Sequence, residues 1–523
     1  MERAMTYLRA DWFETHFGSS QLSVSLIGKF IAVGMLLVVV SDVPSKWDIV
    51  FPIARLIIGV LIFAIIFLPV RPAAIILLLL LVAGRDFDIH PAASMWQMNI
   101  SFIRPSWIVF GLIAVQLFKL RHSFEIPHFV RYLGGWFLIV PVVTGLFYGE
   151  ITGGVALQQW IVDLKFPMML FGVFLLFTIY LKSRPAMLLT MIAAFVGVLA
   201  ARHLIDLVGF FAGIGPELDA GVAGITRVSE DSAKAAVVFF AFFGLLVVAN
   251  YRSKIIWGLM IALPSFALMA AYGTRMIWIE FLVSIPIMIA VVKFRNAVVI
   301  LAATAAMVIG GSGILYVTNQ AAAERVYDRV TSITEGRPQS TFAVDVEYNL
   351  ISRVDPIRYA EILNVAGTMN ERKSWLWGNG YGGYYNDDVV DFPLDLQSSF
   401  PQFQLDNNKF YRTHNYFSQF FHKYGLIGLI LITSIWAIPG YLIIRVIKWR
   451  EVSYGSQEGL LYLVMLAMSV FLLTSMLEMT WSGKGYFINA IVLSIVVRYV
   501  LHHRSPDEKT WPPMMTRMGN WLK

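Results

Sequence analysis

The chain has 523 residues, of which 58% are hydrophobic and 14% are charged, and its mean hydropathy is +0.67. A soluble domain normally carries roughly a quarter charged residues, so this composition excludes a soluble globular protein. The formal net charge of +7 fits basic loops that meet anionic lipid headgroups, and no nucleic-acid-binding pattern accompanies it. The chain contains no cysteine, which excludes disulfides, thiolate nucleophiles and cysteine-based metal sites.

Residues 1–21 combine aromatic and charged side chains and are predicted to form an interfacial helix on the cytoplasmic side. A cleavable signal would place its apolar core directly after a short basic region, and this segment does not. We therefore expect residues 1–21 to lie along the membrane surface ahead of the first span.

Fourteen apolar segments follow in chain order. Runs such as Leu22 to Val40 approach the roughly 20 residues with which a helix spans a bilayer, and they lack the alternating polar positions of a barrel strand. The sequence therefore predicts an all-α polytopic membrane protein with about fourteen transmembrane helices. The third segment is short, and the stretch 186–232 leaves room for a second, half-crossing helix. The predicted spans lie near residues 22–41, 49–69, 73–84, 101–119, 130–148, 160–181, 186–208, 233–250, 255–271, 276–292, 297–317, 416–447, 457–479 and 484–501.

Short loops rich in lysine and arginine mark the cytoplasmic side of a membrane protein. In the fourteen-span arrangement these loops and the C-terminal tail fall on one side, so both termini are predicted to be cytoplasmic. The chain then divides into an N-terminal segment (1–21), eleven spans (22–317), a large periplasmic loop (318–415), three spans (416–501) and a cytoplasmic tail (502–523). The basic residues behind this orientation are Lys119, Arg121, Lys182, Arg184, Arg252, Lys254, Lys293, Arg295, Arg445, Lys448 and Arg450.

The 318–415 loop is too long and too aromatic to be a simple connection. Tryptophan, tyrosine and phenylalanine recur between Trp375 and Phe410, and leaving these side chains in water would be unfavourable. We expect an ordered loop with short helices near 321–333 and 351–366. The glycines of the turn 378–383 are expected to let the backbone approach another segment closely.

Four arginines lie on the predicted outer side, where the charge rule does not require them: Arg227, Arg275, Arg353 and Arg412. A guanidinium is a permanently charged fork that fits phosphate oxygens, so four converging arginines would form a diphosphate site. The alternative for each arginine taken alone is an ion pair with a nearby acid or contact with lipid headgroups. Position favours a functional role most for Arg275 and Arg412.

His414 lies between Arg412 and Asn415 at the start of the twelfth predicted span. A neutral imidazole there can accept a proton near neutral pH, and the adjacent arginine would favour this base form. Asn415 is a candidate to orient His414 or to bind sugar. His422, about two turns further on, is expected to be a packing residue.

Three further groups have structural and functional interpretations. Tyr381 and Tyr384 are candidates to stack on sugar rings, and packing within the loop is an equal alternative. Gly425 and Gly428 are expected to allow close helix contact. The acidic residues between 387 and 395 offer oxygen ligands, but their spacing matches no calcium-binding loop, so a solvated acidic face and no metal site are expected.

The spacing of His414-Asn415, nine residues, then Gly425-x-x-Gly428 resembles the signature of the O-antigen ligase and polymerase superfamily. The glycine-rich turn 377–382 is similar to a family element. Three arginines add to the resemblance to different degrees. The resemblance as a whole covers residues 225–450. Arg353 lies upstream of the turn as in the family, Arg275 follows a small residue as it opens a span, and Arg227 matches less well because the residues after it differ.

Members of this superfamily are integral membrane enzymes that transfer glycans from undecaprenyl diphosphate. The resemblance implies a GT-C-like fold and a metal-independent glycosyl transfer on the periplasmic face of a bacterial inner membrane, without a cofactor. It implies that Arg275, Arg353 and Arg412 bind the donor diphosphate and that His414 deprotonates the acceptor. The expected partners are an undecaprenyl-diphosphate-linked oligosaccharide donor, a glycan acceptor and the lipid bilayer, together with a flippase and a chain-length regulator.

Polymerisation of O-antigen or exopolysaccharide repeat units is the expected activity, because the long N-terminal half exceeds what a minimal ligase needs. The alternative within the superfamily is an O-antigen ligase, which transfers glycan to a lipid A core or to protein. The alternative from another class is a lipid-linked glycan transporter or flippase, supported by charges within the predicted spans. These charges belong to Lys29, Arg55, Asp163, Lys165 and Glu280.

Overall fold

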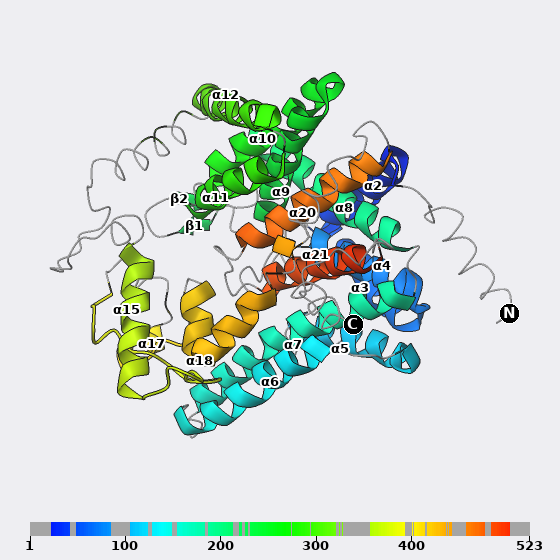
Figure 1. Ribbon diagram of the computed structural model, residues 1–523. Coiled ribbons are helices and arrows are strands. Elements are labelled where there is room, and N and C mark those ends of the chain that lie inside the picture. The colour runs from blue at the N-terminus through cyan, green and yellow to red at the C-terminus, as the bar shows by residue number, and fades with distance from the viewer. Residues whose placement is uncertain are drawn as a thin grey trace, which may run out of the picture.

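Nearly all of the described chain is helical, and the main exceptions are a short hairpin and an ordered coil around residue 380. Figure 1 shows these helices as one bundle, with a smaller helical group beside it. The computed structural model describes residues 22–41, 49–84, 105–123, 128–148, 154–183, 187–212, 219–221, 225–227, 231–272, 275–292, 294–318, 320, 324, 327, 356–392, 400, 402–413, 416–435, 437, 439–441, 457–475 and 483–502.

A helix coincides with each of the fourteen predicted spans within the described residues. Five of these helices, α2, α7, α8, α12 and α18, are long and apolar enough to cross a membrane, and shorter apolar helices accompany them. This is the architecture of an all-α membrane protein, and the number of crossings stays a prediction. The helices are α2 (Val24–Ser41), α3 (Val50–Phe67), α4 (Val70–Ala83), α5 (Pro105–Lys119), η1 (Arg121–Ser123), α6 (His128–Tyr148), α7 (Gly154–Ser183), α8 (Met187–Ala212), α9 (Asp231–Asn250), η2 (Arg252–Lys254), α10 (Ile255–Tyr272), α11 (Arg275–Val291), α12 (Phe294–Thr318), α18 (Tyr416–Ile435), α20 (Gln457–Ser475) and α21 (Gly483–His502).

The third predicted span is the short helix α4, which the other helices enclose. Its 14 residues correspond to about 21 Å of helix, less than the roughly 30 Å of a hydrocarbon core. Every residue from Pro72 to Ala83 except Ile76 is buried, and α4 packs against α2, α3, α5, α7, α8 and α21. A helix that is hydrophobic on all sides is stable when protein surrounds it.

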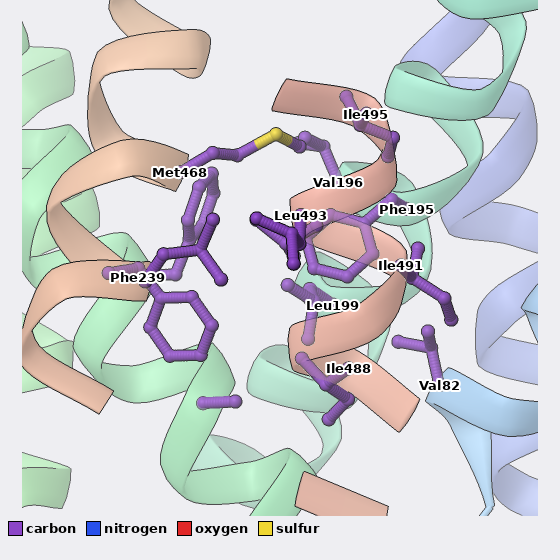
Figure 2. Packing of buried hydrophobic residues seen from close by; sticks show 14 of the residues in the cluster. Val82, Phe195, Val196, Leu199, Phe239, Met468, Ile488, Ile491, Leu493 and Ile495 are labelled. Carbon is purple, nitrogen blue, oxygen red and sulfur yellow. The ribbon is translucent and has the colours of Figure 1, made fainter. Parts of the chain in front are cut away.

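The core of the bundle is built from closely packed helix pairs, in which α9 packs along α10, α2 along α8 and α7 along α21. Small residues permit these approaches: a Cβ on Gly244 of α9 would lie 2.7 Å from the Cβ of Ala262 in α10. Figure 2 shows the buried centre, where Phe195 of α8, Phe239 of α9 and Met468 of α20 gather around side chains of α21, and Val82 of α4 lies beside Ile491. Polar side chains are also buried within these helices, among them Asp163 and Lys165 of α7, Arg202 and His203 of α8 and Glu280 of α11.

A hairpin lies between α8 and α9, where the sequence also leaves room for a second, half-crossing helix. Helix α8 runs unbroken from Met187 to Ala212. Strands β1 (Asp219–Gly221) and β2 (Ile225–Arg227) then pair antiparallel, with Asp219 opposite Arg227. Among the described residues of this stretch the second helix is therefore replaced by the hairpin.

The large loop has its own hydrophobic core, which confirms that its described part is ordered. Helix α15 (Pro356–Glu371) packs against α18, and the short helix α17 (Gln402–Asn407) follows later in the loop; Figure 1 shows them in one group. Helix α15 begins five residues after the predicted start at 351, and most of the predicted helix at 321–333 lies outside the described residues. The buried cluster of the loop comprises Ala360, Val365, Met369, Tyr385, Val390, Phe392, Phe400 and Phe410.

Candidate functional site

Helix α18 follows the His414-Asn415 motif and is broken at Gly425. This glycine has φ 67° and ψ −172°, a left-handed φ that side-chain-bearing residues rarely adopt. In a regular helix each carbonyl accepts a hydrogen bond from the amide four residues later. At this break, two carbonyls before Gly425 and two amides after it point to other partners.

The carbonyls before the break accept hydrogen bonds from the glycine-rich turn of the large loop. The amide of Asn379 donates to the carbonyl of His422 (2.8 Å), and the amide of Gly380 donates to the carbonyl of Lys423 (3.1 Å). These two bonds replace the helical bonds that the same carbonyls would otherwise accept. The loop therefore completes the backbone pairing on the first side of the break.

The amides after the break donate to the same loop, at carbonyls four residues earlier in the sequence than Asn379 and Gly380. Leu426 donates its amide hydrogen to the carbonyl of Trp375 (2.7 Å), and Ile427 donates to the carbonyl of Leu376 (3.2 Å). All four backbone groups are thus satisfied by residues 375–380. The loop inserts its backbone into the hydrogen-bond ladder of a candidate membrane span.

The glycines of the turn make this contact possible, as the sequence predicts. Gly378 and Gly380 have φ angles of 81° and 73°. A Cβ on Gly378 would lie 2.5 Å from the carbonyl of Lys423, and a Cβ on Gly380 would lie 2.5 Å from the carbonyl oxygen of Pro141 in α6. The predicted close backbone approach is confirmed, and the partners are α18 and α6.

Tyr381 anchors the turn against the bundle. Its side chain is fully buried, its hydroxyl donates to the carbonyl of Phe137, and its amide donates to the carbonyl of Pro141 (2.9 Å). Its ring meets Trp160 and Tyr424 edge-on. Of the two roles considered for Tyr381, this position favours packing, because a sugar ring has no access to the phenol face while the loop is docked.

A buried ion pair ties the turn to two helices. Lys423 Nζ of α18 and Asp163 Oδ2 of α7 lie 2.6 Å apart, and their side chains are 0% and 1% exposed. The ammonium also donates to the carbonyl of Gly383 (2.6 Å), and the carboxylate accepts from the amide of Gly382 (3.0 Å). The acid therefore binds a loop N–H and the cation binds a loop C=O. Asp163, one of the charges that supports the transporter alternative, is thus neutralised by Lys423 and holds the loop.

The segment that leads to His414 is also held by the loop. Arg412 is half-buried, and its carbonyl accepts a hydrogen bond from the hydroxyl of Tyr385 (2.9 Å). The backbones of Tyr385 and Phe410 exchange two hydrogen bonds (2.9 and 3.0 Å). Burial, together with the nearby charges of Glu361 and Asp387, raises the pKa of Tyr385 well above its usual value, so the phenol stays protonated and remains a donor.

Tyr385→Phe is expected to lower the free energy of unfolding by about 1–2 kcal/mol, because the Arg412 carbonyl loses its donor in a largely buried place. Thermal unfolding of the purified protein in lipid nanodiscs measures this loss. Tyr132→Phe is the control, because Tyr132 is exposed on α6. Equal stability of the Tyr385→Phe and wild-type proteins would contradict the anchoring role of this hydroxyl.

A second contact holds the same segment from within α18. The amide of Thr413 donates to Oε1 of Gln419 (2.7 Å), and both residues are buried. Gln419 is one turn into the helix, so its side chain reaches back to the residue that precedes His414. The backbone on the N-terminal side of His414 is therefore fixed by contacts to the loop and to the helix.

Four cations gather around the docked turn: Arg372, Lys409, Arg412 and Lys423. The guanidinium of Arg372 lies 4.2 Å and the ammonium of Lys409 4.8 Å from the ring centroid of Tyr384. Arg372 also donates to the carbonyl of Tyr384 (3.1 Å), and the charges of Arg412 and Arg372 both repel that of Lys423. No sequence motif marks Arg372 or Lys409, and the folded loop brings them to one ring.

Most of the predicted site residues lie beyond what the structure describes. Arg353, His414 and Asn415 are outside the described residues, and the side chains of Arg227 and Arg275 are outside them too. The backbone of Arg227 ends β2 and that of Arg275 begins α11. Convergence of the arginines and His414 on one diphosphate therefore stays a prediction.

The two motif glycines have different partners. Gly428 lies against α6, where an added Cβ would be 3.0 Å from Nε1 of Trp136, so its expected helix contact is confirmed. Gly425 instead meets the loop backbone at Leu376 and Trp377. The expectation of helix contact is wrong for Gly425, because the helix breaks there and the loop occupies the space.

His422 and the acidic residues complete the surroundings. His422 is fully buried, with its ring edge-on to Tyr385 at 5.3 Å, and this position agrees with the expected packing role. Asp388 and Asp391 are exposed, but Asp387 is half-buried. Burial is the main cause that raises the pKa of Asp387, so the expected solvated face does not extend to this carboxyl.

The described contacts hold Arg412 and Thr413, which directly precede the motif, against the loop and against α18. The folded loop places Arg372 and Lys409 beside the ring of Tyr384, and such a concentration of cations attracts anionic groups. The chain matches no protein-family model and no curated protein. The family resemblance therefore rests on the sequence motifs alone.

Proposed function

We propose that the protein is a membrane glycosyltransferase with a GT-C-like fold of about fourteen spans, acting on the periplasmic face of a bacterial inner membrane. Its donor is an undecaprenyl-diphosphate-linked oligosaccharide. Its acceptor is a hydroxyl group of a second glycan, and its product is a longer O-antigen or exopolysaccharide chain. The proposal needs neither a metal nor a cofactor.

The observation that carries the proposal is the docking of the large loop onto the helix that follows His414 and Asn415. The break at Gly425 falls at the first glycine of the motif, and it receives the glycine turn of the loop. The glycine-rich turn 377–382 and Gly425, two elements of the sequence resemblance, thereby meet at the same break in α18. The contacts of Arg412 and Thr413 fix the backbone directly before His414, and a positioned group supports catalysis because it avoids the entropic cost of finding its substrate.

The proposed reaction is a substitution at the anomeric carbon of the donor sugar. The acceptor oxygen forms a bond to this carbon while the bond from the carbon to the diphosphate oxygen breaks, and the leaving diphosphate keeps the electron pair. His414 takes the proton of the acceptor hydroxyl. The guanidinium groups of Arg275, Arg353 and Arg412 stabilise the negative charge that develops on the diphosphate. Attack opposite the leaving group inverts the anomeric centre.

The cations of the described loop support anion binding near this motif. Arg412 lies two residues before His414 in the sequence, and Arg372 and Lys409 lie over the ring of Tyr384, which contacts Tyr411. Arginine and lysine bind phosphate oxygens through charge-assisted hydrogen bonds. Tyr384 holds the two cations beside Tyr411, whose ring lies edge-on to it at 6.2 Å.

The test is a reconstituted assay with the purified protein in nanodiscs and a lipid-linked oligosaccharide repeat as the sole glycan. Polymerisation produces a ladder of lipid-linked products on a gel. A single transfer that requires an added lipid A core identifies a ligase. Absence of any glycan transfer, with movement of the intact lipid across a proteoliposome membrane, would identify the transporter and sink the enzyme proposal.

His414→Ala is expected to reduce the transfer rate by about a hundredfold or more, because a positioned base supplies about a hundred- to ten-thousandfold in rate. Arg412→Ala is expected to reduce it as well, with Arg412→Lys retaining part of the activity as a point charge. Lys373→Ala is the matched control, because Lys373 is an exposed cation of the same loop. If His414→Ala and Lys373→Ala proteins had equal rates, His414 would not be the base.

A further inference from the structure

We propose that residues 374–383 form a re-entrant segment at the membrane boundary, and that Trp375, Leu376 and Trp377 contact the lipid of the bilayer directly. The sequence alone places this whole stretch in a loop outside the membrane. The inference rests on the membrane assignment and on the docking geometry, and it stands or falls independently of the glycosyltransferase proposal.

The depth of the segment follows from its contacts with α18. The chain carries no charged residue from Tyr424 to Ile444, a run of 21 residues (444 − 424 + 1) between Lys423 and Arg445. About 20 apolar residues of helix cross a hydrocarbon core, so this run marks the membrane-crossing part of the twelfth predicted span, of which α18 covers the residues up to Ile435. The loop pairs with the amides of Leu426 and Ile427, which lie inside this run.

Two other helices give a similar depth. The loop meets the carbonyl of Pro141, seven residues before α6 ends at Tyr148 (148 − 141), and the carboxylate of Asp163, nine residues after α7 begins at Gly154 (163 − 154). At about 1.5 Å per residue these positions lie roughly 10 and 14 Å along the helices from their ends. The turn therefore reaches well below the ends of the helices that hold it.

The backbone of the segment is paired in the way that membrane depth requires. Non-helical backbone is tolerated within a membrane where its polar groups find partners inside the protein. Six consecutive amides of the turn do so, although none belongs to a regular helix or strand. These amides donate from Gly378 to Ser374, Asn379 to His422, Gly380 to Lys423, Tyr381 to Pro141, Gly382 to the Asp163 carboxylate, and Gly383 to Gly380.

Three consecutive side chains near the start of the segment are large, apolar and exposed. Trp375, Leu376 and Trp377 are 43%, 47% and 40% exposed, and the neighbouring Leu426 and Ile430 of α18 are 44% and 59% exposed. The apolar surface of the loop is thus continuous with the exposed side of a membrane-crossing helix. Lipid is the occupant that fits, because tryptophan is enriched where hydrocarbon meets the headgroups.

The charges that precede the segment fit the same placement. Arg372 and Lys373 come directly before Ser374, and Lys373 is exposed. Basic side chains at the end of a membrane-embedded segment are attracted to anionic headgroups. Cations at the headgroup level followed by Trp-Leu-Trp at the hydrocarbon boundary give a polarity order along the chain that matches the bilayer.

The absence of cysteine from the chain makes the test direct, because each single-cysteine variant carries one label. Trp375→Cys and Trp377→Cys are spin-labelled in nanodiscs containing anionic lipid, and collision with oxygen is compared with collision with a water-soluble nickel chelate. Ile430→Cys is the lipid reference on α18, and Asn370→Cys is the exposed reference at the end of α15. Oxygen dissolves in hydrocarbon and the chelate does not.

We expect positions 375 and 377 to favour oxygen over nickel, as position 430 does, and position 370 to favour nickel. Preference for nickel at 375 and 377 would overturn the proposal by placing the segment in water. Low collision with both probes would overturn it by indicating a protein partner in place of lipid. Leu376→Cys is a second reporter if a tryptophan variant loses the wild-type thermal unfolding profile. The readout needs no substrate, so an inactive protein with a lipid-exposed segment would contradict the function alone.

Discussion

Asp163→Asn is expected to lower the free energy of unfolding by about 3–5 kcal/mol, because it leaves the Lys423 ammonium buried without its counter-charge. The repulsion from Arg412 and Arg372 adds to this loss. Lys423→Met is expected to have a similar effect, since the buried Asp163 carboxylate loses its counter-charge and keeps, among the described residues, the hydrogen bond from the Gly382 amide. Thermal unfolding in nanodiscs measures the stability loss of both variants, and the remaining monodisperse protein is the readout.

The double variant Asp163→Asn with Lys423→Met shows whether the two residues stabilise the protein as a coupled ion pair or contribute to its stability independently. Replacing a buried pair by neutral side chains of similar volume is often much less harmful than removing one charge. We therefore expect the double variant to be more stable than either single variant, with a coupling energy of at least about 1 kcal/mol. Its stability stays below that of wild type, because the Gly383 carbonyl loses the donor it has in Lys423.

The reversed pair, Asp163→Lys with Lys423→Asp, is expected to fail even though it keeps both charges. It would place an ammonium against the Gly382 amide and a carboxylate against the Gly383 carbonyl, so each loop dipole would face a charge of the wrong sign. Rescue by this swap would contradict the idea that the pair holds the loop. Additive effects of the two neutral substitutions would contradict the coupling itself.

Gly380→Ala is expected to abolish docking of the loop and to cost several kcal/mol of stability. An L residue at φ 73° is strained by about 1–2 kcal/mol. The new Cβ would also lie 2.5 Å from the Pro141 carbonyl oxygen and closer still to the Gly145 amide nitrogen. Both atoms belong to the backbone of α6, so neither can move aside as a flexible side chain would.

Gly145→Ala tests the same contact from the other side, because its Cβ would overlap the Tyr381 backbone. Gly134→Ala is the matched control in the same helix, since a Cβ there meets nothing within 4 Å. The control is expected to be neutral or slightly stabilising, by up to about 1 kcal/mol. A Gly380→Ala protein that kept wild-type stability and label accessibility at position 375 would refute the docked geometry.

The helices of this protein were predictable because their signal is local. An uninterrupted apolar run such as Leu22 to Val40 allows one stable conformation in a membrane, so position and type follow from composition. The glycine turn at 378–383 was predictable for a similar reason, since clustered glycines permit conformations closed to other residues. What the turn approaches is a separate question, which its own residues do not answer.

The site was less predictable because its contacts join distant parts of the chain. Asp163 and Lys423 each carry a plain signal, a charge within a predicted span, but no spacing rule links residues 260 positions apart (423 − 163). Gly425 was expected to contact a helix, since small residues in membrane helices usually do. The break in α18 arises from the docked loop, which competes with the helix for the same hydrogen bonds.

By itself the sequence determined that this is a membrane protein built from helices, with an ordered loop and a charged histidine motif at the start of one helix. Hydrophobic runs and their charged ends carry that information along the chain. The tertiary structure alone decided that residues 375–380 enter the backbone ladder of α18 and that Asp163 and Lys423 hold them there. The physical reason is that backbone groups are alike in every residue, so their pairing depends on which segments meet in space.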